Sequence, residues 1–583
     1  MKYKLFNELE LMDFDNPCDF VMKNRKVNDY QHYLNTTDAD LFSPLQLLNM
    51  AEGAKMLIRN ISMNKKTLVI VDSDNDGYTS SALLINYLHR LFPTFVEENL
   101  TYVLHEEKVH GIADVIINEE IEFLIVPDAG SSEFLLHDLL GENGIETLIL
   151  DHHELSEDYQ KRSKYAVIIN NQLGDYPNKH ISGAGVTYKF CEFLDSLLGV
   201  EIAKDFQDLA AVGICGDMMD IRPYETRHMI KTGFENFKNP FLTSLARKNS
   251  FPMKDIISPF TVSFYIVPFI NAITRIGTMQ EKTILFRSML ETDAYLKIPS
   301  TKRGHKPGDM ETVIEQCLRI CTNVKNKQDK LVSELQEKIE TFIEKNNLLD
   351  NKILIILLEK GEKGLNGLVA NKLMAKYQKP TLILIHDKEK GIYAGSARGV
   401  NGSEMEDFKA FCLSTGYPDM CQGHPNAFGF SIQESKLEEF IQYTNTVLKD
   451  YTFEPVYKVD YIVYSWDIGL NEVILKIAEM KNIWGQDLPE PFIAVEEVKV
   501  NANNLTMMKS NTVKITLKKN SDLSFIKFKM SQEEYDNLIK EIGEGYIELT
   551  IIGTCEANFW NGHTSPQIII KDYEITKKVP YDF

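Results

Sequence analysis

The sequence lacks the features of a secreted, disulfide-stabilised or membrane protein. Its eight cysteines are scattered over 583 residues without a C-x2-C pair, which argues against a disulfide scaffold or a zinc knuckle. Cys317 and Cys321 lie on an expected helix, and we interpret both as buried thiols. The N-terminal stretch has acids where a signal peptide needs an apolar run, and no stretch reaches the roughly 18 apolar residues of a membrane span. We therefore expect a cytoplasmic protein with no membrane partner.

Basic residues are also in deficit. The chain has 63 Lys+Arg against 84 Asp+Glu, which gives a formal net charge of −21. This balance excludes a protein that coats nucleic acid or anionic membrane through a uniformly basic surface, although local basic segments remain compatible with it. The 44% hydrophobic content excludes a largely disordered chain, and the length suggests roughly three or four domains.

The sequence has no internal repeat, so its organisation is taken from the alternation of apolar runs and helical patterns. Four short β-rich runs, typical of a buried parallel sheet in an α/β fold, lie at 67–71, 101–104, 123–127 and 147–150. A mainly helical region follows over 183–299, and one long helix is expected over 310–347. A second α/β block covers 352–449. Alternating β-type runs from 456 onward are typical of a small closed or partly open barrel.

Acidic residues follow the expected strands of the first block. They occur in four segments, Asp72-Ser-Asp74-Asn-Asp76-Gly77, Asp128-Ala-Gly130, Asp151-His152-His153 and Gly213-Ile-Cys-Gly216-Asp217-Met-Met-Asp220. Open α/β sheets bind their ligands beyond the carboxyl ends of the strands, so these side chains should meet there. Carboxylates with a few imidazoles suit two divalent cations, either Mg²⁺ or Mn²⁺, and the imidazoles favour Mn²⁺.

Other interpretations of these segments are open from the residues alone. An EF-hand loop that began at Asp72 would need Glu at its twelfth position, where the sequence has Leu83, and this loop follows a strand. The two histidines could be ordinary core or surface residues. Asp217 and Asp220 could cap a helix.

With these four motifs in order, the chain resembles the DHH phosphoesterase superfamily, named for the triplet seen here at 151–153. Within it the chain is most similar to the RecJ group of single-strand-specific 5′→3′ exonucleases. The segments that carry this resemblance are SGAGV (182–186), PFINAITRIG (268–277), NGLVANKL (366–373), GSARG (395–399), QGHPNAFGF (422–430), WGQDLPEPF (484–492) and SPQIIIKDYE (565–574).

The resemblance implies an α/β fold in four parts. A DHH parallel-sheet domain with a helical insertion (1–309) would be joined by a connector helix (310–347) to a smaller α/β DHH-associated domain that binds substrate (348–452). An OB-type β-barrel that binds nucleic acid (453–583) would follow.

The resemblance also implies a site with two divalent cations, Mn²⁺ or Mg²⁺. Its metal ligands would be Asp74, Asp76, Asp128, His152 and Asp217. Asp128 would bridge the metals, Asp72 would be a further member of the site, and His153 would face the scissile phosphate. The catalytic set is therefore His153, Asp128 and Asp72.

Substrate-binding residues follow from the same resemblance. They are Arg275, Ser396, Arg398, Gly423 and His424. Two positions depart from the family pattern, since Gln422 stands where the first Gly of a G-G-H motif is usual and Gly399 stands where Ser is usual. Both changes fall in the substrate-binding domain and leave the metal set intact.

Two segments are locally basic and could contact a polyanion. Residues 222–254 contain seven Lys or Arg against two Glu, and residues 506–530 contain six Lys against one Asp. In the second segment we expect a nucleic-acid track at Lys514, Lys518 and Lys519, although the solvated face of a strand would have the same composition. Trp466, Trp484 and Trp560 could stack on bases or pack in the core.

The resemblance implies a processive 5′→3′ exonuclease that hydrolyses single-stranded DNA in recombination and repair. The alternatives are a DHH phosphodiesterase acting on short oligonucleotides or cyclic dinucleotides, and a non-catalytic DNA-binding replication scaffold. The expected partners are single-stranded DNA and a single-strand-binding protein or a helicase. The protein is expected to be a monomer.

Overall fold

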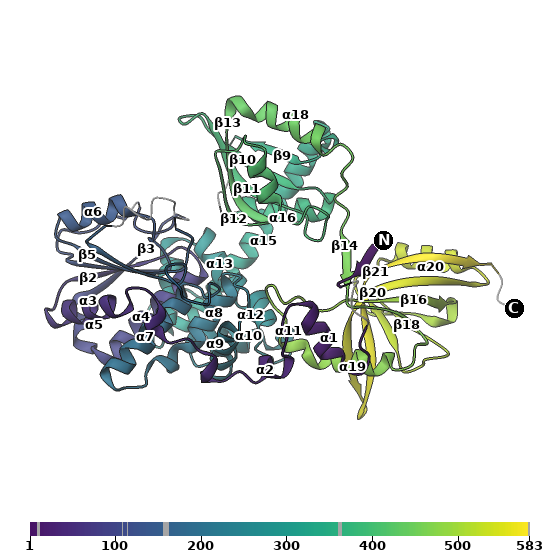
Figure 1. Cartoon of the computed structure of the whole chain (residues 1–583), viewed down its shortest axis with the longest axis horizontal. Helices are drawn as coiled ribbons and strands as arrows, with labels where there is room; N and C mark the ends of the chain where they lie inside the picture. The colour runs from purple at the N-terminus through teal and green to yellow at the C-terminus, as the bar shows by residue number, and fades with distance from the viewer. Residues whose placement is uncertain (8–11, 108, 114, 156–162, 360–363, 581–583) are drawn as a thin grey trace. The chain divides into compact units, whose positions relative to one another are not determined.

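The structure is a computed structural model that describes residues 1–7, 12–107, 109–113, 115–155, 163–359 and 364–580. The chain divides into two compact units, one of residues 31–331 with 482–488, the other of residues 1–30, 332–481 and 489–583. Figure 1 labels many of the helices and strands of both units.

The first unit is built on a five-stranded parallel sheet in the order β3-β2-β4-β5-β6. The four expected strands are present as β2 (Thr67–Val71), β3 (Leu100–Leu104), β4 (Phe123–Pro127) and β5 (Glu146–Asp151), and β6 (Ala166–Asn170) was not expected. The chain passes from β2 to β3 on one side and returns to β4 on the other side of β2. The strand order therefore reverses between β2 and β4, which is where sheets of this kind bind ligands.

Helices pack around this sheet, and those over 183–289 form the helical region that the sequence predicts. The buried α4 (Asn75–Leu91) packs against α7 (Gly183–Leu198) and α8 (Gln207–Gly216). The other helices are α2 (Tyr30–Leu34), α3 (Met50–Ser62), α5 (Pro93–Asn99), α6 (Phe134–Glu142), α9 (Tyr224–Glu235), α10 (Pro240–Lys248), α11 (Ser250–Met253), α12 (Pro259–Tyr265), α13 (Val267–Ile276) and α14 (Met279–Met289).

The sequence predicts no membrane-spanning segment, but one stretch of this region meets the length and hydropathy criteria for one. Residues 259–276 are 18 residues with a mean hydropathy of 1.2, long and apolar enough to cross a membrane by length and composition alone. The stretch is divided between α12 and α13, and half of it is buried inside the protein. A core helix of a water-soluble protein passes the same test, so the stretch is weak evidence for a membrane segment.

The expected long helix is α15 (Val313–Lys345), which spans 33 residues and runs from the first unit into the second. It follows a short hairpin of β7 (Lys297–Pro299) and β8 (Met310–Thr312). Cys317 and Cys321 lie on this helix and both are buried, as expected.

The middle block forms a five-stranded mixed sheet in the order β12-β13-β11-β10-β9. Its apolar core includes Phe408, Phe430 and Phe440. The strands are β9 (Leu354–Leu358), β10 (Thr381–Asp387), β11 (Ile392–Arg398), β12 (Met420–His424) and β13 (Ala427–Gln433), and the helices are α16 (Asn366–Tyr377), α17 (Phe408–Ser414) and α18 (Leu437–Val447).

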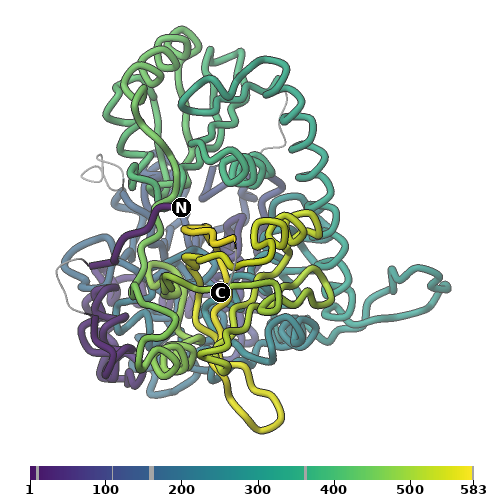
Figure 2. The backbone as a smooth tube through the Cα atoms, turned by 90° about the vertical axis from the view of Figure 1, so that its right-hand side faces the viewer, coloured from purple at the N-terminus to yellow at the C-terminus, as the bar shows by residue number. Residues whose placement is uncertain are grey.

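The C-terminal block is the OB-type part, with a seven-stranded sheet in the order β15-β16-β20-β21-β19-β18-β17. The long β20–β21 hairpin is the last, yellow part of the chain in Figure 2. The elements are β15 (Tyr461–Tyr464), α19 (Leu470–Glu479), β16 (Ile493–Val500), β17 (Leu505–Met508), β18 (Thr512–Thr516), β19 (Ser524–Lys527), α20 (Gln532–Ile542), β20 (Tyr546–Trp560) and β21 (His563–Val579).

The first 30 residues pack with this C-terminal block. Strand β1 (Lys2–Leu5) pairs in parallel with β14 (Val456–Val459), and α1 (Pro17–Asn24) contacts α19. Arg25 forms a buried ion pair with Asp460, 2.7 Å between Nη1 and Oδ1. These contacts place residues 1–30 in the second unit, while the boundaries at 309, 347 and 452 remain predictions.

Candidate metal centre

The carboxyl ends of three neighbouring strands bring acidic residues together at the switch point of the first sheet. Asp72 follows β2, Asp128 follows β4 and Asp151 is the last residue of β5, and all three are buried. Because β2, β4 and β5 are adjacent and parallel, their carboxyl ends meet at one edge. The acids that lie far apart in the sequence are therefore close in space.

The start of α4 supplies two further carboxylates. Asp74 is the N-cap, and its Oδ1 accepts hydrogen bonds from the N–H groups of Asp76 (3.0 Å) and Gly77 (3.2 Å). Asp76 accepts from Ser182 Oγ at 2.7 Å and from the N–H of Gly183 at 2.6 Å. The SGAGV segment therefore fixes the Asp76 carboxylate from the N-terminus of α7.

Asp128 occupies a strained turn. Its φ of 68° lies in the left-handed region, which Asp tolerates better than most residues, and its N–H donates to the carbonyl of Leu150 at 2.7 Å. An added Cβ on Gly183 would lie only 2.3 Å from Oδ1 of Asp128. Glycine at 183 thus allows α7 to approach the Asp128 side chain.

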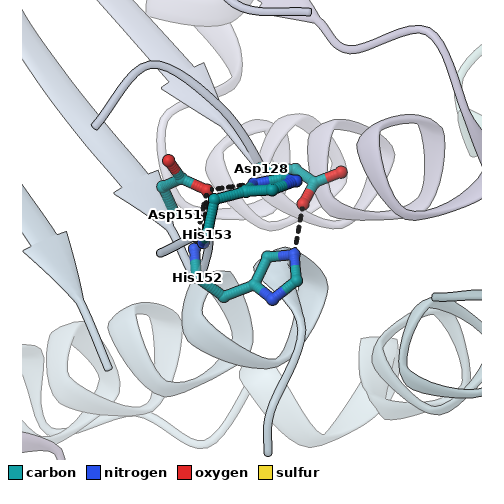
Figure 3. Close-up of side chains that lie close together, drawn as sticks. All are labelled: Asp128, Asp151, His152 and His153. Atoms are coloured by element: carbon teal, nitrogen blue, oxygen red, sulfur yellow. Dashed lines mark hydrogen bonds and ion pairs between the residues drawn. The ribbon is translucent and has the colours of Figure 1, made fainter. Parts of the chain in front are cut away.

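His152 connects these acids, and Figure 3 shows its contact with Asp128. Its Nε2 lies 3.3 Å from Oδ1 of Asp128, 3.4 Å from Oδ2 of Asp217 and 3.9 Å from Oδ2 of Asp76. Asp217 occupies the C-terminal cap position of α8. Asp220 instead forms an ion pair with Arg222 at 2.6 Å. The structure brings four of the predicted ligands together and places His152 inside the cluster, buried, in contrast to an ordinary surface histidine.

His153 points to a different partner. Its Nδ1 lies 2.8 Å from Oδ1 of Asp151, which also accepts from the N–H groups of His152 and His153 (Figure 3). Burial lowers the pKa of His153, but the hydrogen bond and charge of Asp151 outweigh it and raise that pKa to about 10. The side chain of His153 is 49% exposed while that of Asp151 is buried. A buried carboxylate therefore orients an accessible imidazole at the mouth of the site.

His110 is a second histidine held by a buried carboxylate, and the sequence did not predict it. Nδ1 of His110 lies 2.6 Å from Oδ2 of Asp72, and the ring centroids of His110 and His153 are 6.4 Å apart. Ligand atoms of His110, Asp72 and Asp74 all lie within 4.8 Å of one another. The segment after β3 contains none of the four motifs, so the sequence pattern does not single out His110.

The cluster carries more negative charge than a buried site tolerates. Burial raises the pKa of Asp76 to about 6. Burial, and then the charges of Asp76 and Asp74, raise the pKa of both Asp128 and Asp217 well above the usual range. Buried carboxylates that repel one another need compensating cations. Carboxylate oxygens with one or two imidazole nitrogens are a donor set that fits Mn²⁺ or Mg²⁺.

Arg275 lies in the last turn of α13, in the same unit as this cluster. Burial lowers its pKa, and the negative charge of Asp74 opposes that effect. The charge of Arg275, a predicted substrate-binding residue, thus interacts with the acidic cluster.

The other predicted substrate-binding residues gather on the middle sheet. Arg398 on β11 is paired with Ala427 on β13, which is paired with His424 on β12. The side chains of Arg398 and His424 therefore lie in one row on the same face, and Ser396, two residues from Arg398, shares that face. An added Cβ on Gly367 would meet Nη2 of Arg398 at 2.5 Å, so glycine there makes room for the guanidinium.

The local structure explains why glycine occupies two positions at this sheet. Gly423 has a φ of 129°, which side chains rarely adopt. At Gly399 an added Cβ would lie 2.2 Å from Oδ1 of Asn426. The Asn426 amide donates to Asn401 Oδ1 and the Glu406 carbonyl, both at 3.0 Å. This chain has Gly399 where the family pattern has Ser, and the side chain of Asn426 occupies the space that a serine side chain would need.

The two basic segments differ in structure. Most cations within 222–254 contact other residues of the protein. Arg222 forms an ion pair with Asp220, Lys238 forms one with Asp205, and Lys248 donates a hydrogen bond to the carbonyl of Leu318. In the second segment Lys518 and Lys519 line a common cavity of the OB-type block. Lys514 lies on β18 and is not among the residues that line it.

The fold and this acidic centre define the class of protein, a DHH-type phosphoesterase. Residues 66–214 match the DHH family N-terminal domain, residues 350–450 the DHHA1 domain, and residues 468–572 the RecJ OB domain. The OB-type and DHH-associated assignments made from the sequence are therefore confirmed.

Similar proteins narrow the class further. The chain is 35% identical to the SPbeta prophage-derived single-strand DNA-specific exonuclease YorK of Bacillus subtilis, over 99% of both chains. It is 25% identical to the single-stranded-DNA-specific exonuclease RecJ of the same organism, over 94% of this chain and 66% of that protein. The crystal structure of RecJ with Mn²⁺ from Thermus thermophilus has the same fold, with a TM-score of 0.69 at 19% identity over 96% of this chain and 76% of that one. The chain belongs to the RecJ-type family of single-strand DNA-specific exonucleases.

Proposed function

We propose that the protein hydrolyses phosphodiester bonds of single-stranded DNA as a 5′→3′ exonuclease that depends on two divalent cations, Mn²⁺ or Mg²⁺. The observation that carries this proposal is the position of the His152 imidazole among the carboxylates of Asp76, Asp128 and Asp217 at the switch point of the sheet. Relatives named as single-strand DNA-specific exonucleases support the substrate class.

Each predicted site residue is assigned a role from its position. His152, Asp76, Asp128 and Asp217 would hold one cation, and Asp72 and Asp74 with Asp128 the other, so that Asp128 is the shared ligand. Bound cations supply a nucleophilic water near neutral pH and stabilise charge on the leaving oxygen. His153, held by Asp151 and half exposed, donates a hydrogen bond to the scissile phosphate. Arg275, Ser396, Arg398, Gly423 and His424 hold the DNA backbone.

Two alternative functions use the same residues differently. A phosphodiesterase of short oligonucleotides or cyclic dinucleotides would need the metal centre but not the OB-type block. A replication scaffold would need the OB-type block but not the metal centre. The presence of both in one chain favours a nuclease that acts on a polymer. We further propose that the protein works in the cytoplasm as a monomer, in recombination and repair, beside a single-strand-binding protein or a helicase.

The decisive experiment compares substrates with the full-length protein. We expect single strands labelled at one end to be degraded with Mn²⁺ or Mg²⁺ from the 5′ end, and duplexes and dinucleotides to react far more slowly. EDTA should stop the reaction. Absence of metal-dependent cleavage would reject the nuclease, and faster cleavage of dinucleotides than of long strands would favour the oligonucleotide phosphodiesterase.

The pKa values of the cluster predict how metal binding depends on pH. Because metals bind ionised carboxylates, cations must displace protons from groups such as Asp76, whose pKa is raised to about 6. Below that pH the apparent Mn²⁺ affinity should fall about tenfold per pH unit for each displaced proton. Calorimetric titration at several pH values, in buffers of different ionisation enthalpy, measures both affinity and proton release. An affinity that does not change with pH would contradict the raised pKa values.

The same shifts predict the stability of the metal-free protein. A group whose pKa is raised on folding stabilises the fold fully below its unfolded pKa, and this contribution is lost as the pH rises through the folded pKa. In EDTA the melting temperature should therefore fall between about pH 4 and pH 6, and Mn²⁺ should restore it at neutral pH. A melting temperature in EDTA that stays level or rises over this interval would contradict the expected penalty for ionising the cluster.

A further inference from the structure

The OB-type block contains a cavity of about 800 Å³, the size of typical small-ligand sites. It lies among the segment after β15, the end of β16, the loop 517–520 that joins β18 to β19, and the start of β20. The residues important to the argument are Trp466, Lys499, Leu517, Lys518, Lys519 and Tyr546. All of them belong to one compact unit.

Trp466, which lines the cavity, belongs to an exposed aromatic stack with Tyr464. The rings of Tyr464 and Trp466 are 5.1 Å apart at an interplanar angle of 9°, so they lie nearly parallel. Trp466 is 50% exposed and Tyr464 is 40% exposed, although large aromatic side chains are usually well covered. Since Tyr464 covers one face of the indole, a planar ligand in the cavity can stack on the other face.

The cavity is basic in a protein that is strongly acidic overall. Lys499, Lys518 and Lys519 line it, against a single acid, Glu497. Lys499 is held in place, since its Nζ lies 5.3 Å from the Tyr546 ring centroid and 3.6 Å from Glu548 Oε1. Within the described part of the chain neither Lys518 nor Lys519 has an ion-pair partner, and both are exposed. Two cations therefore remain to meet an anionic ligand.

The loop that carries these two lysines is fixed to the body of the block. The side-chain amides of Asn520 and Asn471 exchange hydrogen bonds of 3.0 Å, and the Asn504 amide donates to the carbonyl of Thr516 at 2.7 Å. Leu517 is buried at the base of the loop. A site built on a fixed loop loses little conformational entropy when it binds a ligand.

We propose that this cavity is a nucleotide subsite for single-stranded DNA, in which one base stacks on Trp466 and the flanking phosphates contact Lys518 and Lys519. The proposal rests on the proposed function and adds to it a specific contact distant in sequence from the metal centre. Of the predicted basic track, Lys518 and Lys519 line this subsite together with Lys499, and Lys514 lies outside it. Stacking is independent of base identity, so the subsite accepts any sequence.

Binding is measured on the full chain in EDTA, where no hydrolysis occurs, by fluorescence anisotropy of a labelled single-stranded oligonucleotide. Trp466→Ala should raise the Kd about tenfold, and Trp466→Phe should restore most of the affinity because it keeps a stacking ring. The matched control is Trp560→Ala, since Trp560 is 72% exposed but does not line the cavity. The Kd of this control should stay within about twofold of wild type.

The lysines give an independent readout. Lys518→Gln with Lys519→Gln should reduce the slope of log Kd against log salt by the equivalent of one to two phosphate contacts. The control Lys540→Gln, on α20 and outside the cavity lining, should leave the slope unchanged. A Kd of Trp466→Ala equal to wild type, or an unchanged slope in the double variant, overturns the proposal. Displacement from the cavity by an acidic peptide, with DNA affinity unaffected by Trp466→Ala, would also overturn it in favour of a protein partner.

These outcomes are separable from failure of the proposed function. If the wild-type protein binds single strands through Trp466 but cleaves nothing with Mn²⁺, the nuclease proposal fails and the subsite stands. If cleavage proceeds and Trp466→Ala alters neither Kd nor processivity on long strands, the subsite fails and the nuclease proposal stands.

Discussion

Asp128→Asn is expected to lower kcat by about 10³-fold or more while leaving the fold intact, because the proposed shared ligand of both cations loses its charge. Asn is a better test than Ala at this position. Asp128 has a φ of 68°, and Asn adopts the left-handed conformation as readily as Asp, so the turn after β4 should be preserved. Loss of activity can then be attributed to the lost carboxylate charge rather than to a misfolded turn.

The stability of this variant distinguishes a metal role from a structural one. Burial and the neighbouring acids raise the pKa of Asp128, so its ionised form is unfavourable in the metal-free protein. In EDTA at neutral pH, Asp128→Asn should melt at the same temperature as wild type or higher. Addition of Mn²⁺ should stabilise wild type more than the variant.

The matched control lies in the motif that contains Asp217. Asp220→Asn removes a carboxylate that pairs with Arg222 at 2.6 Å, so kcat should remain close to wild type. Asp128→Asn with more than about a tenth of wild-type kcat, or with unchanged stabilisation by Mn²⁺, would rule out the shared-ligand role.

The sequence was sufficient to predict the parts of this site that depend on local pattern. Apolar runs located β2 to β5, and because parallel strands end at one edge, the acids after them could be expected to converge. The strand β6 was missed although its sequence AVIIN is also an apolar run.

Contacts between distant segments could not be predicted in this way. The pairing of His110 with Asp72 joins the loop after β3 to the end of β2, and no spacing rule relates the two. The basic segment 222–254 had the composition of a DNA track, but most of its cations have internal partners that only the tertiary structure supplies. Lys499 lines the same cavity as Lys518 and Lys519 because of how β16 and β18 are placed, and no sequence pattern predicts this arrangement.

Gly183→Ala is the second variant with a large expected effect, and it leaves every proposed ligand in place. Gly183 is the first residue of α7, where its N–H donates to Asp76 at 2.6 Å. In a helix Ala is normally more favourable than Gly, so without a steric conflict the change would stabilise the protein. Here the new Cβ would lie 2.3 Å from Oδ1, 2.5 Å from Cβ and 2.6 Å from Cα of Asp128. The strand end or the helix must therefore move.

The steric conflict with the Asp128 backbone determines that Gly183→Ala destabilises the protein. A flexible side-chain tip could rotate away, but Cα of Asp128 can move only with the turn after β4. We expect a loss of about 1–3 kcal/mol in the free energy of unfolding, as for other overpacked positions. We also expect a loss of about 10²-fold in kcat, because a displacement of about 1 Å at a catalytic centre has that cost. Urea unfolding and single-strand hydrolysis measure the two effects.

Gly185→Ala is the control in the same helix. The three atoms nearest to its new Cβ would be Ile181 Cβ at 3.0 Å, Met229 Cε at 3.6 Å and Ile214 Cδ1 at 3.7 Å, none of which belongs to the acidic cluster. This variant should keep the wild-type kcat and Mn²⁺ affinity, whatever its small effect on stability. If Gly183→Ala loses stability but keeps its activity, the turn at Asp128 tolerates displacement and its position is not critical. If both variants lose activity equally, the effect belongs to α7 as a whole. Only a loss of Mn²⁺ affinity and of kcat confined to Gly183→Ala would support the inference that Gly183 lets α7 approach the carboxylate of Asp128.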